Sequence, residues 1–139
     1  MTTKEYLGQI RIMDIKINQR QQEYDDLCKK RFCIGGFDYT SDRVQHSTDG
    51  QGYTKVINKL VDLQREINCE IDKFYDIKHK IIEEIQQMEK PEQMEVLYRR
   101  YVLYQGFAKI AVEMGYNYDW CCHIHGKALK AFEKIKVRN

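Results

Sequence analysis

The chain has no stretch that approaches the roughly 20 consecutive apolar residues that a membrane-spanning helix requires. No secretory leader is expected either, because the first residues, MTTKEYLGQIRIMDIKINQ, are charged and amphipathic throughout. The five cysteines are odd in number, which argues against a framework of disulfides. These absences predict a cytoplasmic protein with free thiols and no membrane partner.

Motifs for catalysis are missing as well. The chain holds no phosphate-binding glycine loop, nucleophile elbow or two-histidine metalloprotease helix. The spacing of Cys121 and His125, four residues apart on one helical face, suggests a zinc site, with Cys28 or Cys33 as a further ligand. Because no Cys-x-x-Cys pair exists and Cys121 falls where an apolar core residue is expected, we favour a buried thiol. We therefore predict that the chain is not an enzyme and that it binds neither a metal nor a cofactor.

Proline occurs once, at Pro91, and this position divides the sequence. Proline ends a preceding helix and suits the first turn of the next one. Residues 1–90 carry 15 Lys or Arg against 16 Asp or Glu, whereas residues 91–139 carry 8 against 5. We predict an all-α protein with a helical arm over 1–90 and a smaller, more basic domain over 91–139.

The arm is predicted to contain two amphipathic helices, over about 3–32 and about 54–88, because apolar residues recur in both at steps of three and four. Glycine, serine, threonine and aspartate dominate residues 34–53, which predicts a long loop between them. The second helix would be roughly 50 Å long, too long for a compact core of this size. Its apolar stripe needs a partner: the first helix folded back as an antiparallel, coiled-coil-like hairpin, a second copy of the chain, or both. We favour a homodimer.

The segment from Gly106 to Lys130 has the order of residues that a helix-turn-helix requires. Ala111 is small enough for two helices to cross closely, and Gly115 can adopt the positive φ that ends the first helix. Tyr116 then fills the corner, and Asn117 can cap the second helix. The inward face of that helix is predicted to carry Cys121, Ile124, Ala128 and Leu129. A short helix within residues 92–106 would pack behind this pair and complete a three-helix domain.

Residues 92–135 resemble region 4 of bacterial sigma factors, the part of those proteins that binds promoter DNA. The matching positions are Phe107, Ile110, Ala111, Met114, Gly115, Tyr116, Asn117 and Lys127-Ala128-Leu129. With its N-terminal helical region and glycine-rich loop, the chain also resembles the phage-encoded RinA/ArpU-like transcriptional regulators of Gram-positive hosts. The resemblance implies control of late phage genes and makes host RNA polymerase a candidate partner. Sigma factors place arginines early in the recognition helix, where this chain has Tyr118 and Trp120, so no promoter preference carries over.

The resemblance also assigns roles to side chains on double-stranded DNA. The first turns of a recognition helix reach deepest into the major groove. The residues placed toward base edges are Tyr118, Asp119, Cys122 and His123. Asn117 is placed near a phosphate as the helix cap, and Lys127 and Lys130 would approach the backbone. Arg99 and Arg100, on the flank of the preceding helix, are either phosphate contacts or solvated surface charges. Trp120 is expected to pack against the preceding helix.

The sequence therefore predicts a DNA-binding transcriptional regulator of a phage or prophage. One alternative is a small terminase subunit, which also joins a helix-turn-helix to oligomerising helices. Another is a helical protein-interaction module that does not bind DNA.

Overall fold

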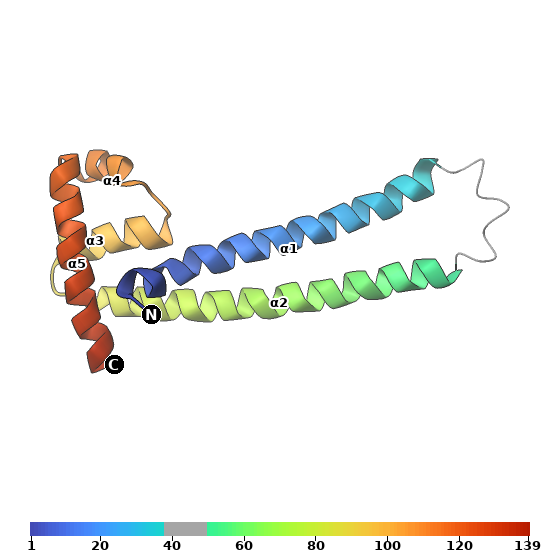
Figure 1. Ribbon diagram of the computed structural model, residues 1–139, viewed down its shortest axis with the longest axis horizontal. Helices are drawn as coiled ribbons and strands as arrows, with labels where there is room; N and C mark the ends of the chain where they lie inside the picture. Colours follow the sequence, from blue (N-terminus) through green and yellow to red (C-terminus); the bar gives the residue numbers. More distant parts are fainter. Residues whose placement is uncertain (38–49) are drawn as a thin grey trace. The chain divides into compact units, whose positions relative to one another are not determined.

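The computed structural model describes residues 1–37 and 50–139, and this part of the chain is all-helical, as predicted (Figure 1). Within these described ranges, five α-helices and one π-helical turn follow one another. They are α1 (Thr3–Phe37), α2 (Gly50–Gln86), α3 (Pro91–Leu97), the π-helical turn η2 (Tyr98–Val102), α4 (Phe107–Met114) and α5 (Tyr118–Arg138). None of the helices in the described ranges has both the length and the apolar character needed to cross a membrane.

The two long helices extend further toward each other in sequence than predicted. Helix α1 continues to Phe37 and α2 begins at Gly50, so both ends of the loop predicted over 34–53 are helical. The remainder of that loop, residues 38–49, lies outside the described residues. Extending an existing helix adds one backbone hydrogen bond for every residue that is fixed. These hydrogen bonds offset the loss of helix stability of about 1 kcal/mol that each glycine causes relative to alanine.

The chain divides into two compact units, and the division does not fall at Pro91 as predicted. Unit 1 contains residues 1–14 and 73–139, and unit 2 contains residues 15–72. Within unit 1 the Tyr6 ring packs on Phe132 with centroids 6.1 Å apart, and the Tyr6 hydroxyl donates a hydrogen bond to Glu84 at 2.8 Å. The start of α1 and the end of α2 therefore belong to the same core as α5, which the sequence prediction had assigned to a separate domain.

Unit 2 consists of residues 15–37 of α1 and residues 50–72 of α2, which run alongside each other (Figure 1). Leu60, Leu63 and Ile67 of α2 are buried at this contact. Arg20, which interrupts the apolar stripe of α1, pairs with Glu66 and, at 3.1 Å, with Glu70. Exposed ion pairs of this kind contribute less than about 1 kcal/mol each, so the apolar side chains account for most of the stability of unit 2.

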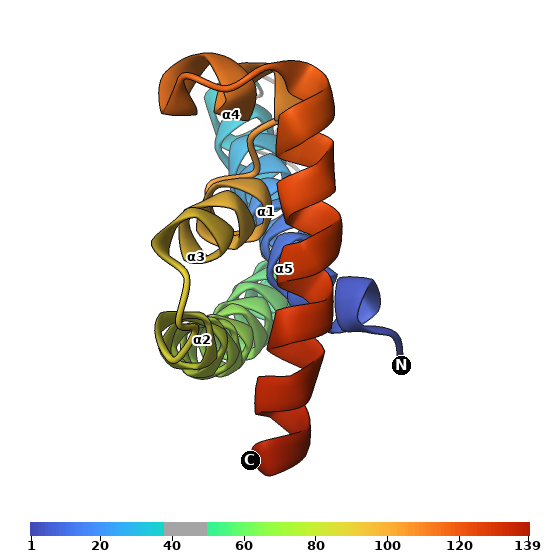
Figure 2. The same cartoon turned by 90° about the vertical axis from the view of Figure 1, so that its left-hand side faces the viewer.

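The core of unit 1 lies where α3, α4 and α5 meet. Its central cluster consists of Val96, Ile110, Ala111, Cys121 and Ile124, with Phe107 and Met114 packed against it. Figure 2 shows α4 lying across the N-terminal end of α5. Pro91 stands in the first turn of α3, as predicted, because that position needs no backbone N–H.

The short helix predicted within residues 92–106 is interrupted. Helix α3 ends at Leu97, and the π-helical turn that follows is closed by a hydrogen bond from the Leu103 N–H to the Tyr98 oxygen. Tyr104 then adopts a positive φ of 58°, which is uncommon for a residue with a side chain. Burial, with a hydrogen bond to Asp14, raises the pKa of Tyr104 to about 12. The wider turn and the left-handed residue redirect the chain toward Gly106, the residue that precedes α4.

Candidate nucleic-acid interface

The corner between α4 and α5 is built on Gly115. This residue has a φ of 74° and a ψ of 26°, in the left-handed region where glycine avoids the steric cost of a Cβ. The Tyr116 N–H donates to the Ala111 oxygen at 2.9 Å and the Gly115 N–H donates to the Val112 oxygen at 3.3 Å. This pair of bonds satisfies carbonyls that the end of α4 would otherwise leave without partners. The Tyr116 side chain remains 36% exposed, so it fills the corner only in part.

Asn117 caps α5, as predicted. Its backbone is extended, with a φ of −78° and a ψ of 163°, and its Oδ1 accepts a hydrogen bond from the Trp120 N–H at 2.7 Å. Asp119 lies in the first turn, where a carboxylate interacts favourably with the positive end of the helix dipole. The two residues fix the point at which α5 begins and the direction in which it leaves the corner.

The face of α5 that packs on α3 and α4 is apolar, and its buried members include Cys121, Ile124, Ala128 and Phe132. Among the residues predicted to face DNA, those that the structure leaves exposed are Asn117, Tyr118, Asp119, His123, Lys127 and Lys130. Cys122 is half-buried. The Tyr118 ring meets Phe107 edge-on, with centroids 6.5 Å apart, and is still 55% exposed.

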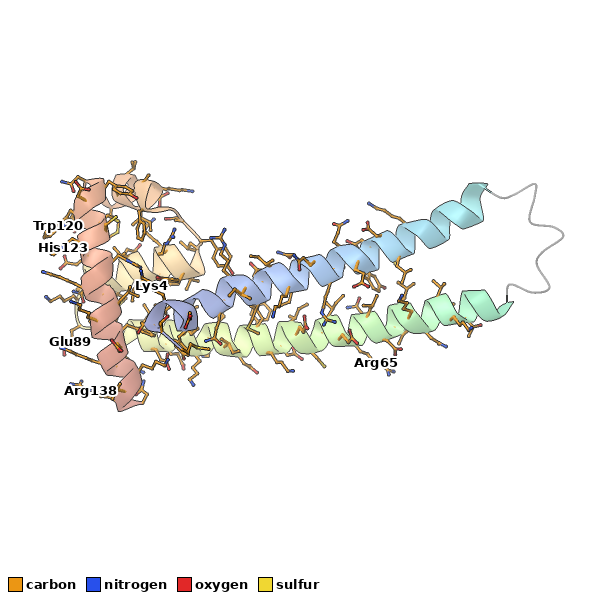
Figure 3. The ribbon with its side chains drawn as sticks, viewed as in Figure 1. Lys4, Arg65, Glu89, Trp120, His123 and Arg138 are labelled. Carbon is orange, nitrogen blue, oxygen red and sulfur yellow. The ribbon has the colours of Figure 1, made fainter. Side chains whose placement is uncertain are left out.

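Side chains at steps of three and four residues form one continuous outward row on α5, which we name the α5 stripe. Its members are Trp120, His123, Lys127, Lys130, Lys134 and Arg138. Trp120 does not pack into the preceding helix as expected: it is 48% exposed, and its ring lies 5.4 Å from the His123 ring at an interplanar angle of 32°. Figure 3 shows Trp120 and His123 toward the N-terminal end of α5 and Arg138 toward its C-terminal end. The stripe therefore carries aromatic rings at one end and cations at the other.

The sequence prediction missed three members of the stripe. Trp120 was expected to pack against the preceding helix, and the prediction assigned no DNA contact to Lys134 or Arg138. The signal was present in the spacing, because these three residues lie in register with His123 and Lys127 on a helix of 3.6 residues per turn.

Arg99 and Arg100, predicted as phosphate contacts or solvated charges, have partners within unit 1. The Arg99 guanidinium pairs with Glu95 at 2.6 Å and also with Glu113, so it joins α4 to the end of α3. Arg100 donates to the Gln105 oxygen at 3.2 Å, and its guanidinium carbon lies 4.5 Å from the centroid of the Phe107 ring. Both side chains hold the connection between η2 and α4, and we do not include them in the proposed DNA contact.

His125 lies on the inward side of α5, where it cannot contact DNA. Its Nε2 is 2.9 Å from the Tyr101 hydroxyl, and its ring packs edge-on against Phe107 at 4.8 Å. Burial, together with the positive charges of Lys4 and Arg100, lowers the pKa of His125 to about 4. The imidazole is therefore neutral at physiological pH and serves as an aromatic core residue.

The alternative of a zinc site at Cys121 and His125 finds no support among the described residues. Nowhere in that part of the chain do three or more His, Cys, Asp or Glu side chains lie in position to hold a metal ion. Cys121 is fully buried, and burial raises the pKa of its thiol, which disfavours the thiolate that zinc requires. The side chain of Cys33, one of the ligands considered, lies outside the described residues.

The outward surface of α5 thus combines hydrogen-bonding and aromatic groups near its N-terminal end with lysines and an arginine further along.

No model of a protein family, no curated protein and no solved structure matches this chain.

Proposed function

We propose that the chain is a sequence-specific DNA-binding protein that regulates transcription, with α4, the Gly115 corner and α5 acting as a helix-turn-helix. The observation that carries the proposal is the α5 stripe, which begins immediately after a capped helix start and continues along the exposed side of the helix. A helix of this kind, projecting from a compact support, has the dimensions that the major groove of B-DNA admits.

Side chains of the α5 stripe and of the residues next to it fall into two groups, one assigned to base edges and the other to phosphates. Tyr118, Trp120 and His123 belong to the first two turns of α5, the part of a recognition helix that reaches base edges. Lys127 and Lys130 follow one and two turns later and would neutralise phosphates. The start of α5, with Asn117, would point toward a phosphate, as helix N-termini commonly do.

We further propose that the arm is an antiparallel helical hairpin that dimerises. Apolar side chains remain exposed on both long helices, at Ile12 (54%), Ile15 (46%) and Val61 (45%). A second copy would cover such a surface and would present two recognition helices to successive major grooves. Light scattering coupled to size-exclusion chromatography tests this: a dimer is expected, a monomer contradicts it, and a large ring favours the small terminase subunit.

The resemblance to sigma region 4 and to RinA/ArpU-like regulators supports a role in phage late-gene control, with host RNA polymerase as a candidate partner. One observation favours the alternative of a protein-interaction module. Val112 on α4 is 82% exposed and Leu103, directly after η2, is 48% exposed, and both are apolar side chains of unit 1. A protein partner would cover them without any need for the charges of α5.

The proposal is tested by selecting genomic DNA fragments with the purified protein at two salt concentrations. We expect a recurrent sequence to be enriched at both, with weaker overall recovery at the higher concentration, because phosphate contacts are screened and base contacts are not. Weak binding with no enriched sequence would contradict the regulator and favour the interaction module.

The base-reading residues are tested with the double variant Tyr118→Ala, His123→Ala. Good base contacts contribute roughly 1–3 kcal/mol of discrimination each, so sequence preference should disappear while salt-sensitive binding remains. Tyr75→Ala with His79→Ala is the matched control, since both residues are exposed on α2 and have the same chemistry. If the Tyr118 and His123 variant binds its best site as well as the control does, the DNA-reading face has been assigned wrongly.

A further inference from the structure

An open groove with a volume of about 440 Å³ lies within unit 1, between the C-terminal half of α5 and the segment that joins α2 to α3. The segment from Gln87 to Gln93 forms one wall. The other wall is α5, with Lys127, Lys130, Lys134 and Arg138 among its lining residues. These four are the cationic members of the α5 stripe, so the groove is the continuation of the surface proposed to bind DNA.

Cations dominate the groove. Lys90 adds a fifth positive charge from the opposite wall, and Glu89 is the one acidic lining residue that the structure describes there. Within the described ranges, no ion pair involves any of the five cationic side chains, Lys90, Lys127, Lys130, Lys134 and Arg138. Lys136, by contrast, is turned to the other side of α5, where its Nζ lies 4.0 Å from the centroid of the Tyr6 ring. The groove therefore gathers five like charges, none of which is paired with a carboxylate among the described residues.

The two walls are joined near the end of α5. The Asn139 side chain donates a hydrogen bond to the Gln87 Oε1 at 3.2 Å, and Gln93, a polar residue of the opposite wall, is 8% exposed. Because the walls are connected, the five cations are held near one another despite their repulsion. Such clustering favours occupation by an anionic ligand.

The length of the cationic row indicates what kind of anion fits. Lys127 and Arg138 are eleven positions apart on a continuous helix, which corresponds to about 17 Å along its axis. One strand of B-DNA carries a phosphate about every 3.4 Å of helix axis, so a row of this length faces several phosphates. A small anion would touch only one or two of the side chains.

We propose that this groove, lined by Lys90, Lys127, Lys130, Lys134 and Arg138, binds the sugar-phosphate backbone of the duplex whose bases are read by the start of α5. The inference rests on the proposed function and extends it: Lys90, Lys134 and Arg138 become DNA contacts, and α5 is engaged along most of its length. Backbone contacts of this type fix the register of a protein on DNA without reading sequence.

The test compares two triple variants of the full chain on a duplex that carries the selected site, with affinity measured across a series of salt concentrations. The groove variant is Lys90→Gln, Lys134→Gln, Arg138→Gln. The control is Lys55→Gln, Lys59→Gln, Arg65→Gln, which removes the same types and number of charges from exposed positions of unit 2. Each lost phosphate contact lowers the slope of log affinity against log salt by about 0.9, so the groove variant should lose between two and three units of slope. Its affinity at physiological salt should fall roughly 10- to 100-fold, with the ranking of DNA sequences unchanged.

Lysine acetylation followed by mass spectrometry supplies a second readout on the unmodified protein. Bound duplex should protect Lys90, Lys127, Lys130 and Lys134, and should leave Lys55 and Lys59 as reactive as before. If the wild-type chain binds the duplex but the groove variant keeps its slope, or Lys90 and Lys134 stay reactive, the groove inference is overturned and the proposed function stands. If the wild-type chain binds no DNA, the proposed function fails and the inference fails with it. If an acidic polypeptide protects these lysines from acetylation and duplex DNA does not, the ligand of the groove is a protein. That result would also refute the backbone contact.

Discussion

Lowering the pH should destabilise unit 1 through His125. This residue is 8% exposed, and burial lowers its pKa from 6.5 to about 4, with smaller contributions from the charges of Lys4 and Arg100. The Nε2 of the neutral ring can either accept a hydrogen bond from the Tyr101 hydroxyl or donate one to it, depending on the tautomer, whereas the protonated ring can only donate there. The folded state therefore favours the uncharged imidazole.

The sign and size of the effect follow from linkage between protonation and folding. Below pH 6.5 the unfolded chain binds a proton at His125 that the folded chain does not bind until the pH is near 4. Stability is therefore lost as the pH falls through this window. Each unit of pKa difference corresponds to about 1.4 kcal/mol, so the loss from this residue between about pH 7.5 and about pH 4.5 is roughly 2–3 kcal/mol.

Urea denaturation followed by tryptophan fluorescence measures this, because the single tryptophan, Trp120, lies on α5 in unit 1. Carboxylates also titrate in this range, so the informative quantity is the difference between wild type and His125→Phe, which keeps an aromatic ring. The free energy of unfolding of the wild type should fall by roughly 2–3 kcal/mol more than that of the variant. His79→Phe, at an exposed position, should behave like the wild type. Parallel losses in wild type and His125→Phe would refute the account.

Three further predictions concern the corner and the groove. Gly115→Ala should lower the free energy of unfolding by about 1–2 kcal/mol, because only the left-handed φ opposes the new Cβ, whereas Gly126→Ala in the middle of α5 should raise it by about 0.5–1 kcal/mol. Thermal denaturation measures both, and shifts in the same direction would contradict the corner geometry. Asn117→Ala removes the cap of α5 and should cost about 1 kcal/mol, and an unchanged melting temperature would show that the cap contributes nothing. Glu89→Gln removes the carboxylate from the groove and should tighten binding to duplex DNA, and weaker binding would contradict the proposed backbone contact.

The corner between α4 and α5 could be predicted from the sequence because each of its requirements is local. A positive φ calls for glycine, a helix start calls for a capping oxygen, and a 3.6-residue repeat divides α5 into two faces. Gly115, Asn117 and Cys121 satisfy these requirements within seven residues, and each has the structural place expected of it. The extent of both long helices was predicted less well, because glycines near a helix end lower its stability without preventing its continuation.

The features that could not be predicted depend on residues far apart in the chain. The boundary between the two units lies away from Pro91 because Tyr6 contacts Phe132 and Glu84. No local sequence pattern predicts those contacts. The π-helical turn places Arg99 opposite Glu113, a partner that a regular helix would not have suggested. Trp120 was misplaced because exposure of a tryptophan runs against its usual preference, and only the packing of α5 shows that its side of the helix is outward.

The shared core of unit 1 also constrains when the protein can fold during its synthesis. Leu7 and Ile10 leave the ribosome well before α5, yet they belong to the unit that α5 completes, and the Tyr6 contact with Glu84 alone spans 78 positions. Domains usually fold as they emerge, but these side chains must wait until translation has passed α5. A nascent chain halted before Tyr118 would expose apolar residues that chaperones recognise, whereas the segment that forms unit 2 would already have emerged in full.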